Sequence, residues 1–164
     1  MTDRSDAVTV RLAHAGDRPF VMTAVERLSA FGVPDGRTKE EIVEGEARTL
    51  RAFFDRPDAP ETLLVADTGG RSSGFVFLEE QQDYFTLETH GHIGILVVAL
   101  EAEGRGVGAA LMRAAEAWAR ARGHRTLTLN VFDGNRRARA MYEHFEFRPD
   151  TVKYMKTLNA EAGH

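Results

Sequence analysis

Three glycines lie close together directly before a helical pattern, at Gly104, Gly106 and Gly108. Glycine has no side chain, so it lets a ligand approach the backbone closely. The first N–H groups of a helix have no partner within it, and together with the helix dipole they attract anions. Residues 103–109 therefore predict a phosphate site, most naturally for a pyrophosphate, to which Arg105 adds positive charge. A tight turn that holds no ligand is the alternative interpretation of the glycines alone.

Two other phosphate-binding motifs explain this loop less well. The dinucleotide fingerprint G-x-G-x-x-G/A is met by Gly104, Gly106 and Ala109, and Asp133 follows as the acid at the end of the next predicted strand. That motif opens a sheet of several parallel strands, however, and only residues 134–164 follow Asp133. The nucleotide-triphosphatase motif G-x-x-x-x-G-K-S/T has no match in the chain. The surrounding elements must therefore decide which ligand is bound.

The elements around the loop are predicted from hydrophobic residues that recur every two positions in strands and every three or four positions in helices. Thr38 and Glu41 form a capping-box pattern, and the sequence Thr-Gly-Gly-Arg at residues 68–71 predicts a hairpin turn. The glycine loop joins a strand to a helix. The predicted helices cover residues 17–31, 38–55, 107–122 and 135–145, and the predicted strands cover residues 8–12, 62–67, 73–78, 92–98, 126–131 and 151–157.

The composition limits the size and the surroundings of the protein. A chain of 164 residues with 43% hydrophobic residues is expected to form a single domain over residues 1–164. The absence of cysteine excludes disulfides and thiolate ligands and suits the reducing cytoplasm. Residues 1–8 lack the apolar run of a signal peptide, and the aliphatic run at 95–100 is far shorter than the roughly 20 residues that span a membrane. We expect a cytoplasmic protein with no membrane partner.

Residues 92–147 resemble the GNAT superfamily of N-acetyltransferases in three motifs that occur in the family's order. Glu103 stands where the family usually has Arg or Gln, Leu100 where Pro is common, and Glu146 where Gly usually precedes Phe. None of these departures removes a backbone donor from the loop. The motifs are a strand with its pyrophosphate loop, an Asn-x-x-Ala pair, and a Tyr followed by Phe, carried here by Leu96, Val98, Gly104, Gly106, Gly108, Asn135, Ala138, Tyr142 and Phe147.

The resemblance implies an α/β (α+β) fold with a mixed, mostly antiparallel central sheet flanked by helices, in which two parallel strands splay apart around the coenzyme. It implies that acetyl-CoA is the cosubstrate, that no metal is used, and that the acetyl group passes in a ternary complex to a primary amine of a small molecule or peptide. A homodimer is left open. The coenzyme contacts implied by the resemblance are Leu96, Val97, Val98, Glu103, Gly104, Arg105, Gly106, Val107, Gly108, Ala109, Asn135, Ala138 and Tyr142.

The catalytic residues follow from thioester chemistry, which needs an acceptor for the amine's proton and a donor for the departing thiolate. The resemblance assigns the donor to Tyr142, whose alternative role is that of a packed aromatic residue. His92 is the candidate proton acceptor, through a bridging water, because it titrates near neutral pH and is expected to share a strand face with residues 94 and 96. The alternative role of His92 is structural.

The resemblance does not supply the proton acceptor, because related enzymes often carry a Glu on the strand at residues 93–95 and this chain has none there. A coenzyme-binding regulatory module that has lost turnover is therefore the non-enzymatic alternative. His90-x-His92 also resembles the start of a metal site, but spacing places no third ligand, so no metal is expected. The side chains that compete with His92 as proton acceptor are Glu80, Asp83, Glu88 and His90.

Charge and capping complete the prediction. The formal net charge of −4 offers no broad attraction to nucleic acid and mildly favours cations such as amines. Asn135 is predicted to cap the last helix.

Three arginines lie just after Asn135, where they either meet the 3′-phosphate of the coenzyme or face solvent; they are Arg136, Arg137 and Arg139. No aromatic residues alternate with these arginines, so no nucleic-acid partner is expected.

Overall fold

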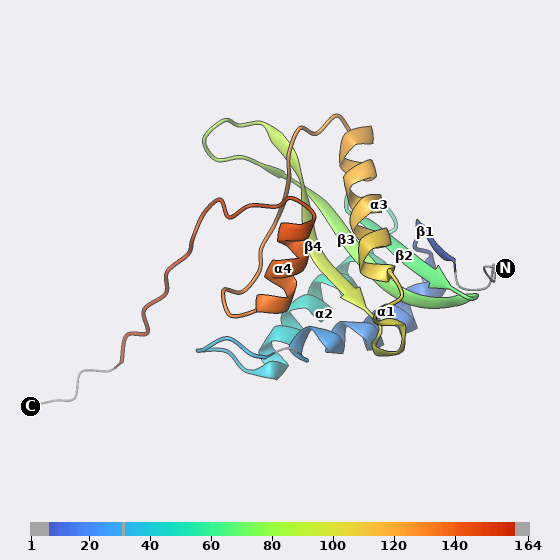
Figure 1. Cartoon of the computed structure of the whole chain (residues 1–164), viewed down its shortest axis with the longest axis horizontal. Helices are drawn as coiled ribbons and strands as arrows, with labels where there is room; N and C mark the ends of the chain where they lie inside the picture. Colours follow the sequence, from blue (N-terminus) through green and yellow to red (C-terminus); the bar gives the residue numbers. More distant parts are fainter. Residues whose placement is uncertain (1–6, 31, 160–164) are drawn as a thin grey trace, which may run out of the picture.

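The computed structural model describes residues 7–30 and 32–159, in which five strands form one sheet in the order β1-β2-β3-β4-β5 (Figure 1). Neighbouring strands are antiparallel except β4 and β5, which are parallel. This confirms the predicted mixed, mostly antiparallel sheet. The strands are β1 (Val8–Leu12), β2 (Thr62–Thr68), β3 (Arg71–Gln82), β4 (Thr89–Val98) and β5 (Leu127–Leu129).

The helices match the predicted positions with one break. The predicted helix over residues 17–31 consists of α1 (Arg18–Ala24) and a 3₁₀ segment (Val25–Ser29), and its predicted end at Phe31 lies outside the described residues. Thr38 caps the next helix as predicted, because its Oγ1 accepts from the N–H of Glu41 at 3.1 Å. The remaining helices are α2 (Lys39–Asp55), α3 (Val107–Ala121) and α4 (Arg136–His144).

The sheet carries a hydrophobic cluster on each face. Figure 1 shows α1 and α2 on one side of the sheet and α3 and α4 on the other, which we name the α1–α2 face and the α3–α4 face. On β3, Phe75 and Phe77 pack toward the α1–α2 face, and Val76 and Leu78 pack toward the α3–α4 face. Side chains along a strand alternate between faces, as these four residues do.

A bulge interrupts β4 at Gly94. Phe77 pairs with Ile95 and Leu78 pairs with Ile93, so Gly94 has no partner on β3. The extra residue changes the alternation, since Ile93 and Leu96 both pack against the α3–α4 cluster. The prediction that His92 shares a strand face with residue 96 is therefore wrong, because His92 points to the α1–α2 face and Leu96 to the opposite one.

The parallel strands β4 and β5 stay together only over a short length. They pair from Gly91 with Leu127 to Ile93 with Leu129, and then β5 ends while β4 continues to Val98. The predicted strand at residues 126–131 is thus shorter than expected. Residues 94–98 of β4 have no partner strand on that edge within the described part of the chain, as the predicted splay requires.

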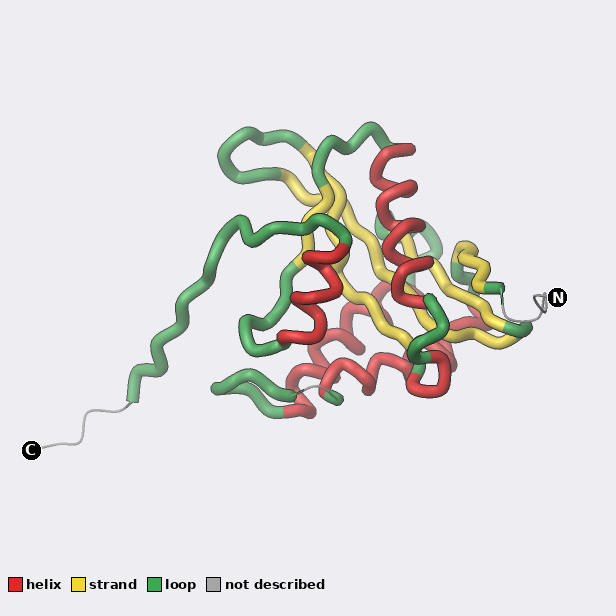
Figure 2. Tube along the Cα trace, viewed as in Figure 1, coloured by secondary structure: helices red, strands yellow, loops and turns green. Residues whose placement is uncertain are grey.

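The last predicted strand is absent. Residues 151–157 form no strand and lead away from β5 as an exposed tail (Figure 2). Their alternating residues indicate a strand, but a strand forms only where a neighbour supplies ladder hydrogen bonds, and none of the described strands lies alongside this segment. Among the described residues, no helix is both long and apolar enough to cross a membrane.

Candidate functional site

The glycine loop leaves backbone donors open at the start of α3. Gly104 and Gly106 have φ angles of 76° and 80°, which L-residues rarely adopt. The first helical hydrogen bond runs from the N–H of Ala110 to the carbonyl of Gly106, at 3.0 Å. In the described part of the chain, no backbone hydrogen bond uses the N–H groups of residues 104–109 as donors. This arrangement suits an anion, as the sequence predicts.

The negative charge at Glu103, the main departure from the family pattern, is compensated by two arginines from other elements. Its Oε1 lies 2.5 Å from Nη2 of Arg27 and 3.5 Å from Nη2 of Arg137. These side chains come from the segment after α1 and from the first turn of α4. The negative charge of the first loop residue is therefore paired with cationic side chains and is not left isolated beside the open N–H groups.

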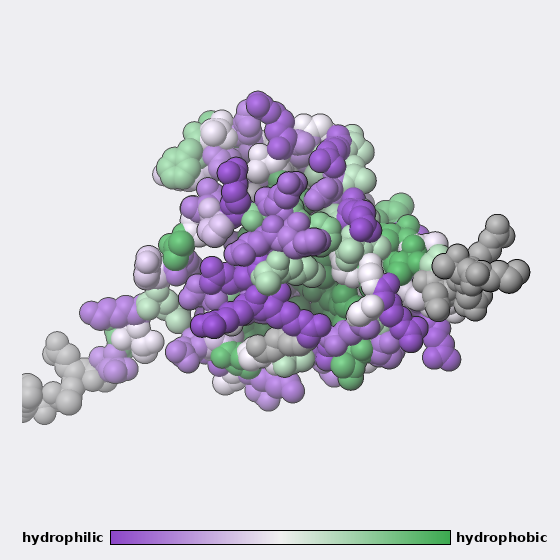
Figure 3. Space-filling view, in the orientation of Figure 1, coloured by the Kyte–Doolittle hydropathy of each residue, from purple (hydrophilic) through white to green (hydrophobic). Residues whose placement is uncertain are grey.

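Two neighbouring elements meet the loop closely. A Cβ on Gly108 would lie 3.6 Å from Sδ of Met141 and 3.7 Å from Cγ2 of Val98, so α4 and the end of β4 both approach the start of α3. Figure 3 shows a hollow with an apolar floor and a hydrophilic border between α3 and α4, over β4. The predicted coenzyme residues Val98, Gly108 and Ala138 come from the three elements around this hollow.

Tyr142 is held in place by the way α4 ends. The N–H of Phe147 donates to the carbonyl of Tyr142 and the N–H of Glu146 to that of Glu143, each at 3.0 Å, which is a Schellman motif. Glu146 has a φ of 68°, in the left-handed region where the family's usual glycine fits without strain. The rings of Tyr142 and Phe147 meet edge to face, with centroids 6.1 Å apart. The Tyr and Phe of the motif thus form one structural unit.

The electrostatics of Tyr142 favour a proton donor. The side chain packs against the hydrophobic cluster of the α3–α4 face. Burial raises the pKa of the phenol, because the charged form would lose its hydration. The phenol therefore keeps its proton at neutral pH.

The start of α4 is capped as predicted. Oδ1 of Asn135 accepts from the N–H of Ala138 at 3.1 Å. Among the arginines that follow, Arg139 is tied to Asp133, whose carbonyl and carboxylate both accept from Nη1 at 3.0 Å. Arg137 pairs with Glu103, so one of the three arginines reaches the glycine loop.

His92 has a connection to β5. Its Nδ1 lies 2.8 Å from Oγ1 of Thr128, at the point where β4 and β5 still pair. The residue is only 5% exposed, and burial lowers the pKa of its imidazole. The negative charge of Glu79 partly offsets this lowering, whereas the charge of His90 lowers the pKa further. These contacts fit the structural role, and its role as proton acceptor stays a prediction.

All three carboxylates that compete with His92 are engaged elsewhere. Glu80 accepts from Nε2 of His124 at 2.9 Å, beyond the end of α3. Asp83 accepts from two N–H groups of its own loop, at 2.7 and 3.0 Å. Glu88 lies 3.8 Å from Nη1 of Arg125. Within the described residues, no group of three His, Asp or Glu side chains has the geometry of a metal site.

Two glutamates that no sequence motif singles out lie on the α1–α2 side, and one of them, Glu79, lies at the bulge in β4. Glu79 of β3 is the register partner of His92 and, two residues after Phe77, points to the α1–α2 face. Glu46 of α2 lies near it, since burial and then the charge of Glu79 raise the pKa of Glu46. The signal available in the sequence was Gly94, because an isolated glycine in a strand often marks a bulge or a close approach.

Glu46 also lines a cavity of about 330 Å³ on this side of the molecule. Phe132, from the segment after β5, closes the cavity from the other side, and the guanidinium of Arg37 lies over its ring, 5.5 Å from the centroid. The cavity therefore lies between α2 and the segment that joins β5 to α4. Its lining residues are Arg37, Glu41, Ile42, Gly45, Glu46 and Phe132.

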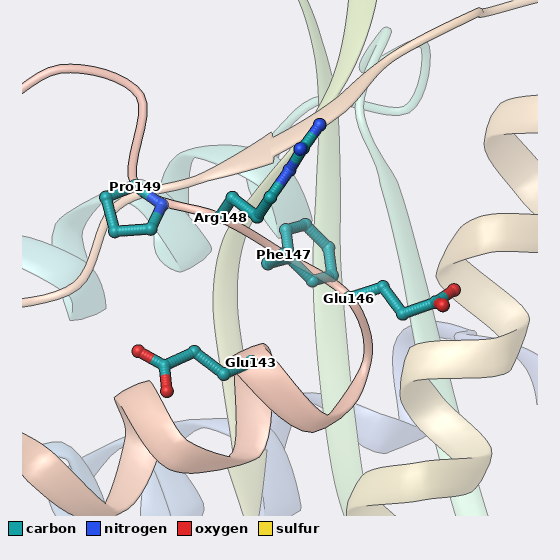
Figure 4. Close-up of a pocket in the computed structure, with 5 residues that line it drawn as sticks. All are labelled: Glu143, Glu146, Phe147, Arg148 and Pro149. Carbon is teal, nitrogen blue, oxygen red and sulfur yellow. The ribbon is translucent and has the colours of Figure 1, made fainter.

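A larger cavity, of about 620 Å³, opens at the other end of α4 (Figure 4). It is lined by Glu143, Glu146, Phe147, Arg148 and Pro149, and Figure 4 shows Glu146 pointing away from Glu143 and Pro149. None of these is a predicted coenzyme contact. The glycine loop approaches α4 near Arg137 and Met141 instead, so we do not assign this cavity to the phosphates.

Comparison with known proteins places the chain in a family. A profile of the acetyltransferase (GNAT) family matches residues 29–147, and the chain belongs to this family. The resemblance found in the motifs is thereby confirmed. The uncharacterized N-acetyltransferase YhfO of Bacillus subtilis (strain 168) is 28% identical over 120 residues, which cover 73% of this chain and 79% of that protein.

Solved structures share the fold. A GCN5-related N-acetyltransferase from Ralstonia eutropha JMP134 superposes with a TM-score of 0.74 at 20% identity, covering 92% of this chain and 99% of the other. A transcriptional regulator from Bacillus halodurans C-125 gives a TM-score of 0.71 at 21% identity, covering 93% and 100%. At this level of identity, the two structures are evidence for the fold alone.

Proposed function

We propose that this chain transfers the acetyl group of acetyl-CoA to a primary amine of a small molecule or peptide. The observation that carries the proposal is the set of open N–H groups at residues 104–109, next to the unpaired edge of β4. Main-chain donors at a helix start bind a diphosphate, and an open strand edge binds the amide groups of a pantetheine arm. Membership of the acetyltransferase family supports this pairing.

The proposed coenzyme contacts follow the chain through these elements. The backbone of Leu96, Val97 and Val98 would bind the arm, and the loop from Glu103 to Ala109 would bind the diphosphate. From α4, Ala138 and Tyr142 would border the arm. Asn135 would add a side-chain hydrogen bond, since its amide nitrogen is free to donate while its oxygen caps the helix.

The chemistry proposed for the site is a direct attack in a ternary complex. The neutral amine nitrogen attacks the thioester carbonyl carbon, a C–N bond forms, and the C–S bond breaks. A main-chain N–H near the bulge of β4 would stabilise the oxyanion, because a bulge frees backbone groups from the ladder. Tyr142 would donate its proton to the departing thiolate, because its raised pKa keeps the phenol protonated until the thiolate forms.

Release of free thiol from acetyl-CoA tests the function. The purified chain is assayed with a panel of spermidine, kanamycin, glycine methyl ester and a short peptide with a free N-terminus. We expect saturable thiol release with at least one amine, above the hydrolysis seen without amine. Coenzyme binding with no release across the panel would contradict turnover and fit the regulatory alternative.

A further inference from the structure

The strand that passes the reacting thioester in this proposal has no carboxylate at its bulge. The residues there are Ile93, Gly94 and Ile95, so the bulge itself supplies no proton acceptor. Direct attack still requires that the amine lose its proton. His92 of β4 lies near the bulge, but it is buried and hydrogen-bonded to Thr128, so we expect the base on an element beside β4.

The carboxylate of Glu79 on β3 lies in the space over Gly94, where β4 has no side chain. A Cβ on Gly94 would lie 3.2 Å from Cδ1 of Phe77 and 3.8 Å from Oε1 of Glu79. The carboxylate of Glu79 thus lies directly over the glycine, across the strand boundary. Any side chain at residue 94 would press on Phe77 and compete with the carboxylate for the same space. The glycine in β4 and the glutamate in β3 fit each other.

The carboxylate of Glu79 is oriented and yet able to accept. Nε2 of Gln81 donates to its Oε1 at 3.1 Å, which fixes one oxygen. A carboxylate has about four lone-pair positions, of which this hydrogen bond uses one. Glu79 is partly buried, so it is neither isolated from a ligand nor fully solvated.

The surroundings of Glu79 provide a path for the amine. Glu46 of α2 lies near enough to Glu79 for the charge of Glu79 to raise the pKa of Glu46, and it also lines the cavity between α2 and Phe132. An amine in that cavity would reach β4 from the α1–α2 face, whereas the glycine loop and Tyr142 belong to the α3–α4 side. The two substrates would then meet at the bulge from opposite faces of the sheet.

We propose that Glu79 is the catalytic base that accepts the proton of the acceptor amine, in place of a glutamate on β4. This inference rests on the proposed acetyl transfer. The proton moves from the ammonium nitrogen to a carboxylate oxygen of Glu79, and the freed nitrogen lone pair forms the C–N bond. The second proton that the nitrogen loses as the C–S bond breaks replaces, through solvent, the one that Tyr142 gives to the thiolate. His92, its register partner, holds β4 to β5 through Thr128 and is a positioning residue.

The test compares Glu79→Gln with Glu80→Gln, using acetyl-CoA and the amine of the panel that gives the fastest thiol release. Glu80 is the neighbour on the same strand, but it points to the opposite face and binds His124. We expect kcat of Glu79→Gln to fall about 100-fold, because general-base catalysis contributes about 100- to 10,000-fold. Glu80→Gln should keep kcat within about threefold. Binding of coenzyme A should be unchanged in both, which shows that both variants fold.

A pH profile separates a base from a structural residue. Without its base, the enzyme depends on amine already neutral in solution, and that fraction rises about tenfold per pH unit below the pKa of the amine. Activity of Glu79→Gln should follow this slope, while the wild type levels off. Among the described residues, the titratable groups that interact electrostatically with Glu79 or with its register partner His92 are Glu46 from α2 and His90 from β4, so Glu46→Gln and His92→Ala are measured alongside.

The outcomes distinguish this inference from the proposed function. Glu79→Asp, which keeps the carboxylate on a shorter side chain, should regain part of the lost activity and the level pH profile. Wild-type turnover in Glu79→Gln, or a tenfold-per-unit slope in His92→Ala alone, would overturn the role of Glu79 and leave the acetyl transfer standing. Absence of thiol release in the wild type would overturn both.

Discussion

The two faces of β4 are built from different kinds of groups. On the α3–α4 side, where we propose that the coenzyme binds, the available groups are mainly backbone atoms: the open N–H groups at residues 104–109 and the unpaired edge at 94–98. On the α1–α2 face, the polar groups are side chains that come from separate elements, above all Glu46 and Glu79. The coenzyme side is thus specified by backbone shape and the acceptor side by side-chain chemistry.

This difference explains why the short motifs that can be recognised in the sequence lie on one side of β4 and not on the other. A backbone site needs glycines, a cap and a helix end at fixed spacing, and these leave a local pattern in the sequence. A side-chain site can be assembled from any residues that the fold brings together, and it can change with the acceptor. The carboxylates near the cavity at Phe132 favour an acceptor that is cationic in solution.

The largest effect expected on the coenzyme side comes from Tyr142→Phe, which removes the phenol and keeps the ring. We expect kcat to fall about 100-fold, since the proton donor to the thiolate is lost. The affinity for coenzyme A should stay nearly the same, because the ring still packs against Phe147. Steady-state kinetics and calorimetry measure the two quantities. Unchanged turnover would remove Tyr142 from the mechanism and leave it as a packing residue.

A smaller effect separates the two roles of Asn135. Asn135→Ala should lower the free energy of unfolding by about 1 kcal/mol, because the cap on the N–H of Ala138 is lost. Asn135→Asp keeps a capping oxygen and should preserve stability, yet it should weaken coenzyme binding, because it loses the amide donor and adds a negative charge. Urea unfolding and calorimetry make the comparison. Normal coenzyme affinity in the Asp variant would leave Asn135 with the capping role only.

More of the proposed coenzyme side than of the proposed acceptor side could be predicted from the sequence, because its motifs are local. The glycines, the cap at Asn135 and the pairing of Tyr142 with Phe147 are local, so their geometry follows from spacing alone. The bulge at Gly94 is also local, but its consequence is not, because it reverses the face of every later residue in β4. Glu79 lies in a polar stretch where a solvated carboxylate and a functional one look alike.

The C-terminal segment shows a second feature that the sequence could not predict. Hydrophobic spacing predicted the strands of the hairpins and the two helices that cover each face. It also predicted a strand at residues 151–157, where pairing depends on a neighbour rather than on the segment's own residues. Which strands pair with each other is therefore what a single sequence predicts least well.

The smallest effect tests whether α4 ends as the family's helices do. Glu146→Gly should raise the free energy of unfolding by about 0.5 to 1 kcal/mol, because glycine adopts the φ of 68° with less strain than glutamate. Glu143→Gly, inside α4, is the matched control and should lower stability by about 1 kcal/mol. Urea unfolding gives both values. A loss of stability in Glu146→Gly would show that the helix end is not strained.

Calorimetric titration with coenzyme A, of the wild type and of Gly106→Val, tests the backbone site most directly. Gly106 has a φ of 80°, so a β-branched residue there should displace the N–H groups and leave the charged side chains in place. We predict saturable binding to the wild type, and binding to Gly106→Val that is weaker by about tenfold or more. Circular dichroism confirms that the variant is folded. No saturable binding to the wild type, or equal affinity in a folded variant, would contradict a diphosphate site made of main-chain donors.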